Sequence, residues 1–216
     1  VQTPLVIAAG WGSRSKFSVL GSMRAAAHIL SYELPMVLVV VAVVMATGTM
    51  STSGIVAAQE QGWFGLTPWG LAGSLIFLLA ATAESNRTPF DMAEAESELT
   101  AGFHTEYAGF KFALFQMSEF LSAFAAGGLE VTLFFGGWRG PDVLPSWAWF
   151  MIKIYLVFLV LVWFRATLPR FRIDQLLAVA WKFLFPLSLL VIASAAVWYQ
   201  PLPLWARLAA NAVLLG

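Results

Sequence analysis

Long runs of apolar residues alternate with short polar connections along the whole chain of 216 residues. Five of these runs are long enough to cross the hydrocarbon core of a bilayer, which takes about 20 helical residues. Lipid offers no partner for an open backbone, and the runs do not alternate as barrel strands do, so each is predicted to be a helix. The five predicted spans are Ala25–Met50, Leu66–Ala83, Phe110–Gly136, Ser146–Leu168 and Leu176–Trp198.

Two shorter apolar runs lie at the ends of the chain, Val1–Gly10 and Leu202–Gly216. Both are too short to span on their own, and we expect them to be partial spans of a longer protein. The predicted fold is therefore all-α: a polytopic transmembrane helix bundle of five full spans plus two partial ones. We find no internal repeat and no soluble domain, so residues 1–216 are predicted to form a single membrane domain.

Composition agrees with a membrane protein and excludes several kinds of binding site. The chain is 60% hydrophobic and only 11% charged, whereas a soluble domain carries about 25% charged residues. Its formal net charge is zero, so the sequence does not support binding to nucleic acid. There is no cysteine and only two histidines, which excludes cysteine-ligated iron–sulfur clusters and disfavours a metal or haem site in this chain.

Basic residues are distributed unevenly between the two sides of the predicted bundle. Nine of the 12 lie in or beside three connections that share one side: Arg14, Lys16, Arg24, Arg87, Lys111, Arg165, Arg170, Arg172 and Lys182. The other side has Arg139, Lys153 and Arg207. The positive-inside rule predicts that the three basic connections face the cytoplasm or the mitochondrial matrix. The connection over residues 136–147 looks like a plain turn between two spans.

The connection between the second and third spans gathers half of all the acidic residues. It reads AESNRTPFDMAEAESELTAGFHTEYAGFKF from residue 83 to 112, and its residues 84–109 are predicted to lie on the basic side. Its six carboxylates are Glu84, Asp91, Glu94, Glu96, Glu98 and Glu106. A carboxylate beside hydrocarbon must pair, stay hydrated or take up a proton. This cluster favours a role in handling protons or cations, although a solvated acidic loop without such a role remains an alternative.

Several neighbours modify this acidic cluster. On a helix Glu94 and Glu98 would lie one turn apart, and we expect one of them to hold its proton more tightly. Arg87 is the nearest counter-charge, and Asp91 is placed to cap a following helix. His104 could relay protons with Glu106, but a lone histidine is more often a structural hydrogen bonder.

Three further glutamates lie inside predicted spans. Glu33 lies in the first span, and an ionisable group there is a functional candidate, unless it lies near the helix end and reaches water. Glu119 and Glu130 lie in the third span, 11 residues or about three helical turns apart, and should share one face. Each could instead make only a structural hydrogen bond, and this second interpretation is the stronger one for Glu130.

Four ordered segments resemble one known family. AESNRTPFDMAEAESEL followed by GFHTEY, together with WGSRSKFSVLGSMRAAAHILSYE, TLFFGGW and RATLPRFRIDQ, is similar to the signatures of the H-type membrane subunit of NADH–quinone oxidoreductase, respiratory complex I. The likeness covers nearly the whole chain. Two departures are Ala93, where the family usually has proline, and Glu130, where it is usually apolar.

The resemblance implies a subunit of a translocase enzyme in the bacterial inner or mitochondrial inner membrane, with no redox centre of its own. Its substrate would be a quinone, and NADH, FMN and iron–sulfur clusters would belong to partner subunits. The expected partners are the other membrane and peripheral subunits, including the quinone-site subunit and the one with the terminal iron–sulfur cluster. The alternative is the equivalent membrane subunit of a related hydrogenase or ferredoxin-dependent complex.

The resemblance also assigns roles to residues. It implies a proton path through Glu33, Glu84, Glu94, Glu96, Glu98, Glu106 and Glu119. It implies positions at the quinone cavity for Arg87, Asp91, His104, Arg165 and Asp174. The resulting hypothesis is that quinone reduction changes the local charge and thereby the proton affinity of the nearby carboxylates. One charge at about 5 Å, at an effective dielectric of about 20, is worth about 3 kcal/mol, which is enough to move a proton.

Overall fold

The computed structural model describes residues 2–13, 15–85, 90, 109–141, 144–167, 173–201 and 203–215. Only the backbone is described for Gln2, Arg165 and Ile173. Within these ranges every regular element is helical, as the apolar pattern predicts.

The longest element is α2 (Lys16–Thr47), and it begins nine residues before the predicted span Ala25–Met50. Only residues 13–15 separate it from α1 (Gln2–Gly12), so the predicted basic connection is almost entirely helix. Lysine and arginine are good helix formers, and their long side chains can reach water from a helix end, which explains the difference. The helix also continues through Pro35.

The remaining elements follow the predicted order closely. They are α3 (Thr52–Ala58), the short 3₁₀ helix η1 (Phe64–Leu66), α4 (Pro68–Glu84), α6 (Phe110–Phe134), α7 (Ser146–Thr167), α8 (Ile173–Val179), the π-helical turn η3 (Ala180–Leu184), α9 (Phe185–Trp198) and α10 (Leu204–Leu215). Because α8, η3 and α9 are continuous, they make one long helix.

Four of the described helices are long and apolar enough to cross a membrane: α2, α6, α7 and the helix from Asp174 to Trp198. The fifth predicted span corresponds to α4, whose 17 residues fall just below the usual spanning length. Length alone therefore places α4 at the border between a spanning helix and a shorter apolar one.

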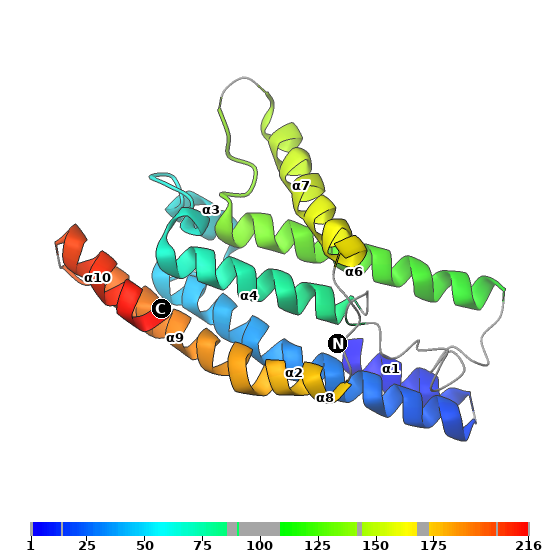
Figure 1. Ribbon diagram of the computed structural model, residues 1–216. Coiled ribbons are helices and arrows are strands. Elements are labelled where there is room, and N and C mark those ends of the chain that lie inside the picture. The colour runs from blue at the N-terminus through cyan, green and yellow to red at the C-terminus, as the bar shows by residue number, and fades with distance from the viewer. Residues whose placement is uncertain are drawn as a thin grey trace.

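The core lies where α2, α4 and α9 run side by side, with α6 beside α4 (Figure 1). Trp69, Phe77 and Phe134 are among its fully buried side chains. At Gly73 an added Cβ would lie 3.3 Å from Val39 and 3.2 Å from Phe134, so the small residue lets α2, α4 and α6 approach closely. In Figure 1, α10 folds back along α9, and α7 crosses α6 at a steep angle.

The connection after α6 is more than the plain turn predicted from sequence. The Lys153 ammonium of α7 donates hydrogen bonds to the carbonyls of Phe135 (2.7 Å), Gly137 (3.1 Å) and Arg139. It also lies 4.5 Å from the centroid of the Trp63 ring. Lys153 is therefore buried against the start of this connection and holds it onto α7.

Gln59, at the end of α3, fixes the same region from the other side. Its side-chain amide donates to the carbonyls of Thr132 (3.0 Å) and Leu133 (3.2 Å), and its oxygen accepts from the Gly136 amide (2.9 Å). The side chain thus satisfies groups that the end of α6 leaves open.

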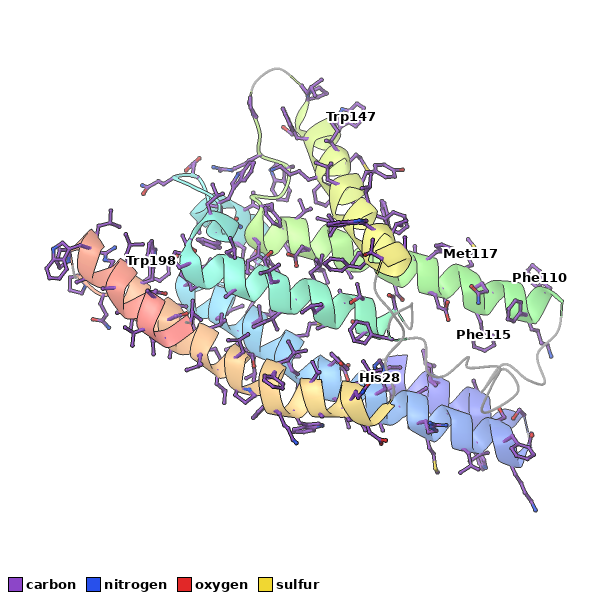
Figure 2. All side chains as sticks on the ribbon, viewed as in Figure 1. His28, Phe110, Phe115, Met117, Trp147 and Trp198 are labelled. Atoms are coloured by element: carbon purple, nitrogen blue, oxygen red, sulfur yellow. The ribbon has the colours of Figure 1, made fainter. Side chains whose placement is uncertain are left out.

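The first half of α6 presents apolar side chains to the outside of the bundle. Figure 2 shows Phe110 and Met117 projecting away from it, and their side chains are 77% and 68% exposed. Phe115, on the other face, packs against Val6, Ala25 and Ile29. Apolar exposure on this scale suits lipid or a neighbouring membrane protein.

Candidate functional site

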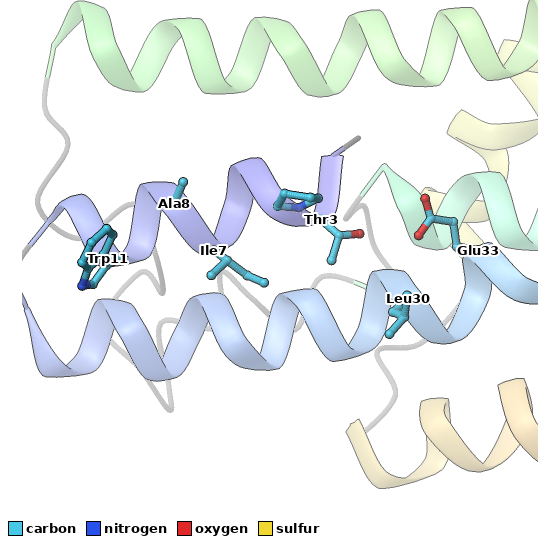
Figure 3. Close-up of a pocket in the computed structure, with 7 residues that line it drawn as sticks. Thr3, Ile7, Ala8, Trp11, Leu30 and Glu33 are labelled. Atoms are coloured by element: carbon cyan, nitrogen blue, oxygen red, sulfur yellow. The ribbon is translucent and has the colours of Figure 1, made fainter.

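Glu33 stands at the inner end of an apolar groove between α1 and α2. The groove has a volume of about 630 Å³ and is lined by Thr3, Pro4, Ile7, Ala8, Trp11, Leu30 and Glu33. Figure 3 shows the carboxylate of Glu33 pointing from α2 toward the space between α1 and α4. The carboxylate is half-buried, and it is the one acidic group among these described lining residues. Such a groove could accept an apolar molecule with one polar end.

Glu84 is the last residue of α4 and lines a second, smaller cavity. This cavity has a volume of about 160 Å³ and lies between α2, α4 and α6. Its lining is Met36, Ala81, Glu84, Ser85, Ser122, Ala125, Ala126 and Leu129. Burial raises the pKa of Glu84, and the negative charge of Glu33 raises it further. The carboxylates of α2 and α4 are therefore electrostatically coupled.

Glu119 belongs to the inward face of α6. Its side chain is 7% exposed, and the buried residues Ala123, Ala126 and Glu130 follow it at helical spacing. Ser122, one turn after Glu119, lines the cavity of Glu84. Glu119 and Glu130 thus lie on one buried stripe, in agreement with their 11-residue separation.

Carboxylates on three helices are thus related in pairs: the charge of Glu33 on α2 acts on Glu84 of α4, and Glu119 of α6 lies one turn before Ser122 in the lining of the cavity of Glu84. Each group is partly or fully removed from water, and the cavity at Glu84 has room for a few water molecules. Carboxyls in such places can take up and release protons when a nearby charge changes. Within the described residues, no group of three histidine, cysteine or acidic side chains could hold a metal ion.

Much of the predicted site lies outside the described residues. This applies to Arg87, Asp91, Glu94, Glu96, Glu98, His104 and Glu106. Arg165 lies on α7, close to its end, but its side chain is outside the description. Asp174 is exposed in the first turn of α8, where its charge complements the helix dipole.

An aromatic group that the sequence did not reveal lies beside these carboxylates. The Tyr32 ring is 5.0 Å from that of His28 and 5.3 Å from that of Phe90, centroid to centroid. The Tyr32 hydroxyl donates to the Leu176 carbonyl at 3.0 Å. Figure 2 shows His28 on α2 close to α8. Tyr32 precedes Glu33 directly, so this contact helps to fix the orientation of α2 at the carboxylate.

A second contact between the same helices involves the π-helical turn. The Trp181 indole donates to the Ser31 hydroxyl at 3.2 Å. A π-helical turn in the middle of a helix is rare and is often found at functional sites. The only advance signal in the sequence was the polar pair Ser31 and Tyr32 within an otherwise apolar run.

Comparisons with known proteins agree with the resemblance. The sequence profile of the NADH dehydrogenase family matches residues 1–196. The H-type subunit of the NADH-quinone oxidoreductase of Dehalococcoides mccartyi (strain CBDB1) is 50% identical over 198 residues, which are 91% of this chain and 55% of the relative. Its counterpart in Geobacillus kaustophilus (strain HTA426) is 51% identical over 195 residues, 89% of this chain and 58% of the relative.

A third relative shows the same coverage. The corresponding NADH-quinone oxidoreductase protein of Carboxydothermus hydrogenoformans (strain ATCC BAA-161 / DSM 6008 / Z-2901) is 48% identical over 193 residues, or 88% of this chain and 54% of the relative. The chain thus spans somewhat more than half the length of these curated relatives. Given the profile match over most of its length, this chain belongs to the NADH dehydrogenase family.

Proposed function

We propose that this chain is part of a membrane subunit of a proton-translocating NADH:quinone oxidoreductase. The observation that supports this most directly is that three helices of an apolar bundle carry carboxyls withdrawn from water, with Glu33 acting on Glu84 and Glu119 one turn from the cavity of Glu84. The family membership and the names of the relatives give the redox context. The chain's own residues supply apolar surface and carboxyls, while electron carriers would belong to partner subunits.

In this proposal the groove at Glu33 contributes to a quinone-binding cavity together with the acidic segment 84–109. The groove is apolar apart from Glu33 and Thr3, which suits a molecule with a hydrocarbon tail and a polar head. Arg87, Asp91, His104, Arg165 and Asp174 are proposed to border the same cavity. Its position on the cytoplasmic or matrix side rests on the distribution of basic residues.

Proton transfer then follows from electrostatics. Reduction of the quinone changes the charge beside Glu33, and Glu33 is coupled to Glu84. Glu84 shares its cavity with Ser122, one turn from Glu119. We propose that the change in charge passes along Glu33, Glu84 and Glu119, with Glu94, Glu96, Glu98 and Glu106 at its start, toward further membrane subunits.

The test uses Glu33→Gln and Glu119→Gln in the intact membrane complex. Glutamine keeps the size and polarity of the side chain but cannot exchange a proton. We expect fewer protons to be translocated per quinone reduced, with the complex still assembled. The matched control is Glu60→Gln, because Glu60 is an exposed carboxylate paired with Arg139 at 2.7 Å. Unchanged quinone reduction and unchanged proton translocation in both variants would remove these residues from the path.

A further inference from the structure

Glu130 is a buried carboxyl that the proposed path does not use. It lies on α6, three turns beyond Glu119, and its side chain is only 2% exposed. The Ser74 hydroxyl of α4 is hydrogen-bonded to it. Its other oxygen, Oε2, has no hydrogen-bond partner among the described residues.

Among the described residues, no cation compensates this carboxyl. On the facing elements, α3 has no charged residue and α4 has only Glu84, at its far end. The described cation of α7 is Lys153, whose ammonium is engaged by three backbone carbonyls. On α6 itself Lys111 and Glu119 are 19 and 11 residues away. In the part of the chain that the structure describes, Glu130 therefore interacts with the neutral partner Ser74.

Burial without a counter-ion strongly disfavours a permanent charge here. An isolated carboxylate in an apolar interior loses its hydration without compensation, and a bound proton removes that penalty. An apolar side chain would fill the same space without any penalty. Leucine at this position would pack as well as the carboxyl side chain does. What the carboxyl adds is the ability to bind a proton.

The cavity of Glu84 reaches the neighbourhood of Glu130. Ala126 and Leu129 line that cavity. Ala126 precedes Glu130 by one turn on the buried face, a rise of about 6 Å, and Leu129 is its neighbour in sequence. The lining of the cavity thus includes Glu84 at the end of α4 and the turn of α6 that precedes Glu130, although Glu130 itself does not line it.

We propose that Glu130 is a reversible proton-binding site on α6, one helical turn beyond Ala126 in the lining of the cavity shared by α2, α4 and α6. A proton that leaves Glu84 crosses the cavity through water and binds Glu130 at Oε2, which leaves Glu84 as the carboxylate and Glu130 as the neutral acid. The reverse transfer restores the first state. Ser74 orients the carboxyl by donating to its other oxygen. The inference rests on the proposed function and deepens it, because it adds a proton site beyond Glu119.

The test compares Glu130→Gln and Ser74→Ala with wild type in the intact membrane complex. The first measurement is the number of protons translocated per quinone reduced. The second is the infrared difference spectrum between the oxidised and the NADH-reduced complex, in the region where protonated carboxyls absorb. We expect Glu130→Gln to lower the proton yield and to abolish one carboxyl band. Ser74→Ala should shift that band, since it removes a hydrogen bond but keeps the acid.

Glu60→Gln is the control and should change neither measurement. An unchanged carboxyl spectrum in Glu130→Gln overturns the inference, and so does an unchanged proton yield. If Glu130→Gln does not assemble, Ser74→Ala decides: a shifted band supports the site and an unshifted spectrum overturns it. Failure here is distinct from failure of the proposed function, because Glu33→Gln and Glu119→Gln would still lower the proton yield.

Discussion

Two polar side chains stabilise this molecule by binding backbone carbonyls that would otherwise lack a partner at the end of a helix. Lys153 and Gln59 together bind the last carbonyls of α6 and the first residues of the connection that follows. The sequence indicates Lys153 only as one of three basic residues on the sparsely charged side, and no pattern in it marks Gln59. The reason is physical: neither side chain has a periodic signal, and the backbone groups they bind belong to segments distant in the sequence, the end of α6 and the connection after it.

A first prediction concerns Lys153→Met, which keeps the length of the side chain but removes its three hydrogen bonds. Three carbonyls lose a charged donor, and the contact with the Trp63 ring is lost as well. We expect destabilisation of about 2–3 kcal/mol, the usual value for hydrogen bonds to a charged group. Protease digestion of the purified complex at increasing temperature, followed at the connection after Phe134, measures it.

Lys182→Met is the matched control for this change. Lys182 is exposed on the π-helical turn, so its replacement should leave the digestion profile of that connection unaltered. Equal sensitivity of the two variants would show that loss of a positive charge, and not loss of the three bonds, causes the effect.

At the scale of elements, the sequence predicted where helices lie better than where they end. The span Ser146–Leu168 corresponds to α7 within one residue, because its apolar run is bounded by proline on both sides. The start of α2 was wrong by nine residues, since lysine and arginine looked like a connection although they favour helix. The π-helical turn could not be predicted, because it depends on how α8 and α9 fit against α2.

A second prediction tests the end of α2. Gly48 closes this helix at φ +68°, and an added Cβ would meet no atom within 4 Å. Gly48→Ala should therefore cost about 1 kcal/mol purely through the left-handed backbone. Gly128 lies inside α6 with ordinary helical backbone, and a Cβ added there would lie 3.7 Å from the nearest atom, Cδ1 of Ile154. Gly128→Ala should be neutral or slightly stabilising, and thermal unfolding of the purified complex compares the two.

A third prediction concerns the contact between α2 and α8. Tyr32→Phe removes the hydroxyl that donates to the Leu176 carbonyl but keeps the ring between His28 and Phe90. We expect a loss of about 1 kcal/mol, felt locally as faster amide hydrogen exchange in residues 173–184. Exchange in α7 is the internal reference, since α7 packs mainly against α6. Faster exchange in both regions would mean a general loosening instead.

For the molecule as a whole, the sequence predicts an all-helical membrane bundle and the positions of its spans along the chain. Composition and the length of the apolar runs are sufficient for this prediction, because only helices satisfy the backbone in such runs. The relation between Glu33, Glu84 and Glu119 could not be predicted in this way. Spacing could place Glu119 and Glu130 on one face of α6, but it could not show that α4 brings Glu84 into the same cavity as Ser122. That juxtaposition depends on small residues such as Gly73, which set the distance between helices.

The last prediction tests how the bundle is oriented in the membrane. In Figure 1 the start of α2 and the start of α6 lie at one end of the bundle, and α3 lies at the other. Lys16 and Arg24 of α2 and Lys111 of α6 are the described basic residues at the first end, so we expect it to face the cytoplasm. The chain has no cysteine, so a single introduced cysteine can be labelled without a background from the rest of this chain.

Lys16→Cys and Ser51→Cys are suitable positions, because both residues are exposed near opposite ends of α2. A membrane-impermeant maleimide should label Lys16→Cys only in inside-out vesicles and Ser51→Cys only in right-side-out vesicles. Lys16 could be covered by a partner protein, so Arg24→Cys and labelling after removal of peripheral subunits with a chaotrope provide the control. Labelling of both cysteines from the same side would refute the proposed orientation, and with it the side from which the quinone cavity opens.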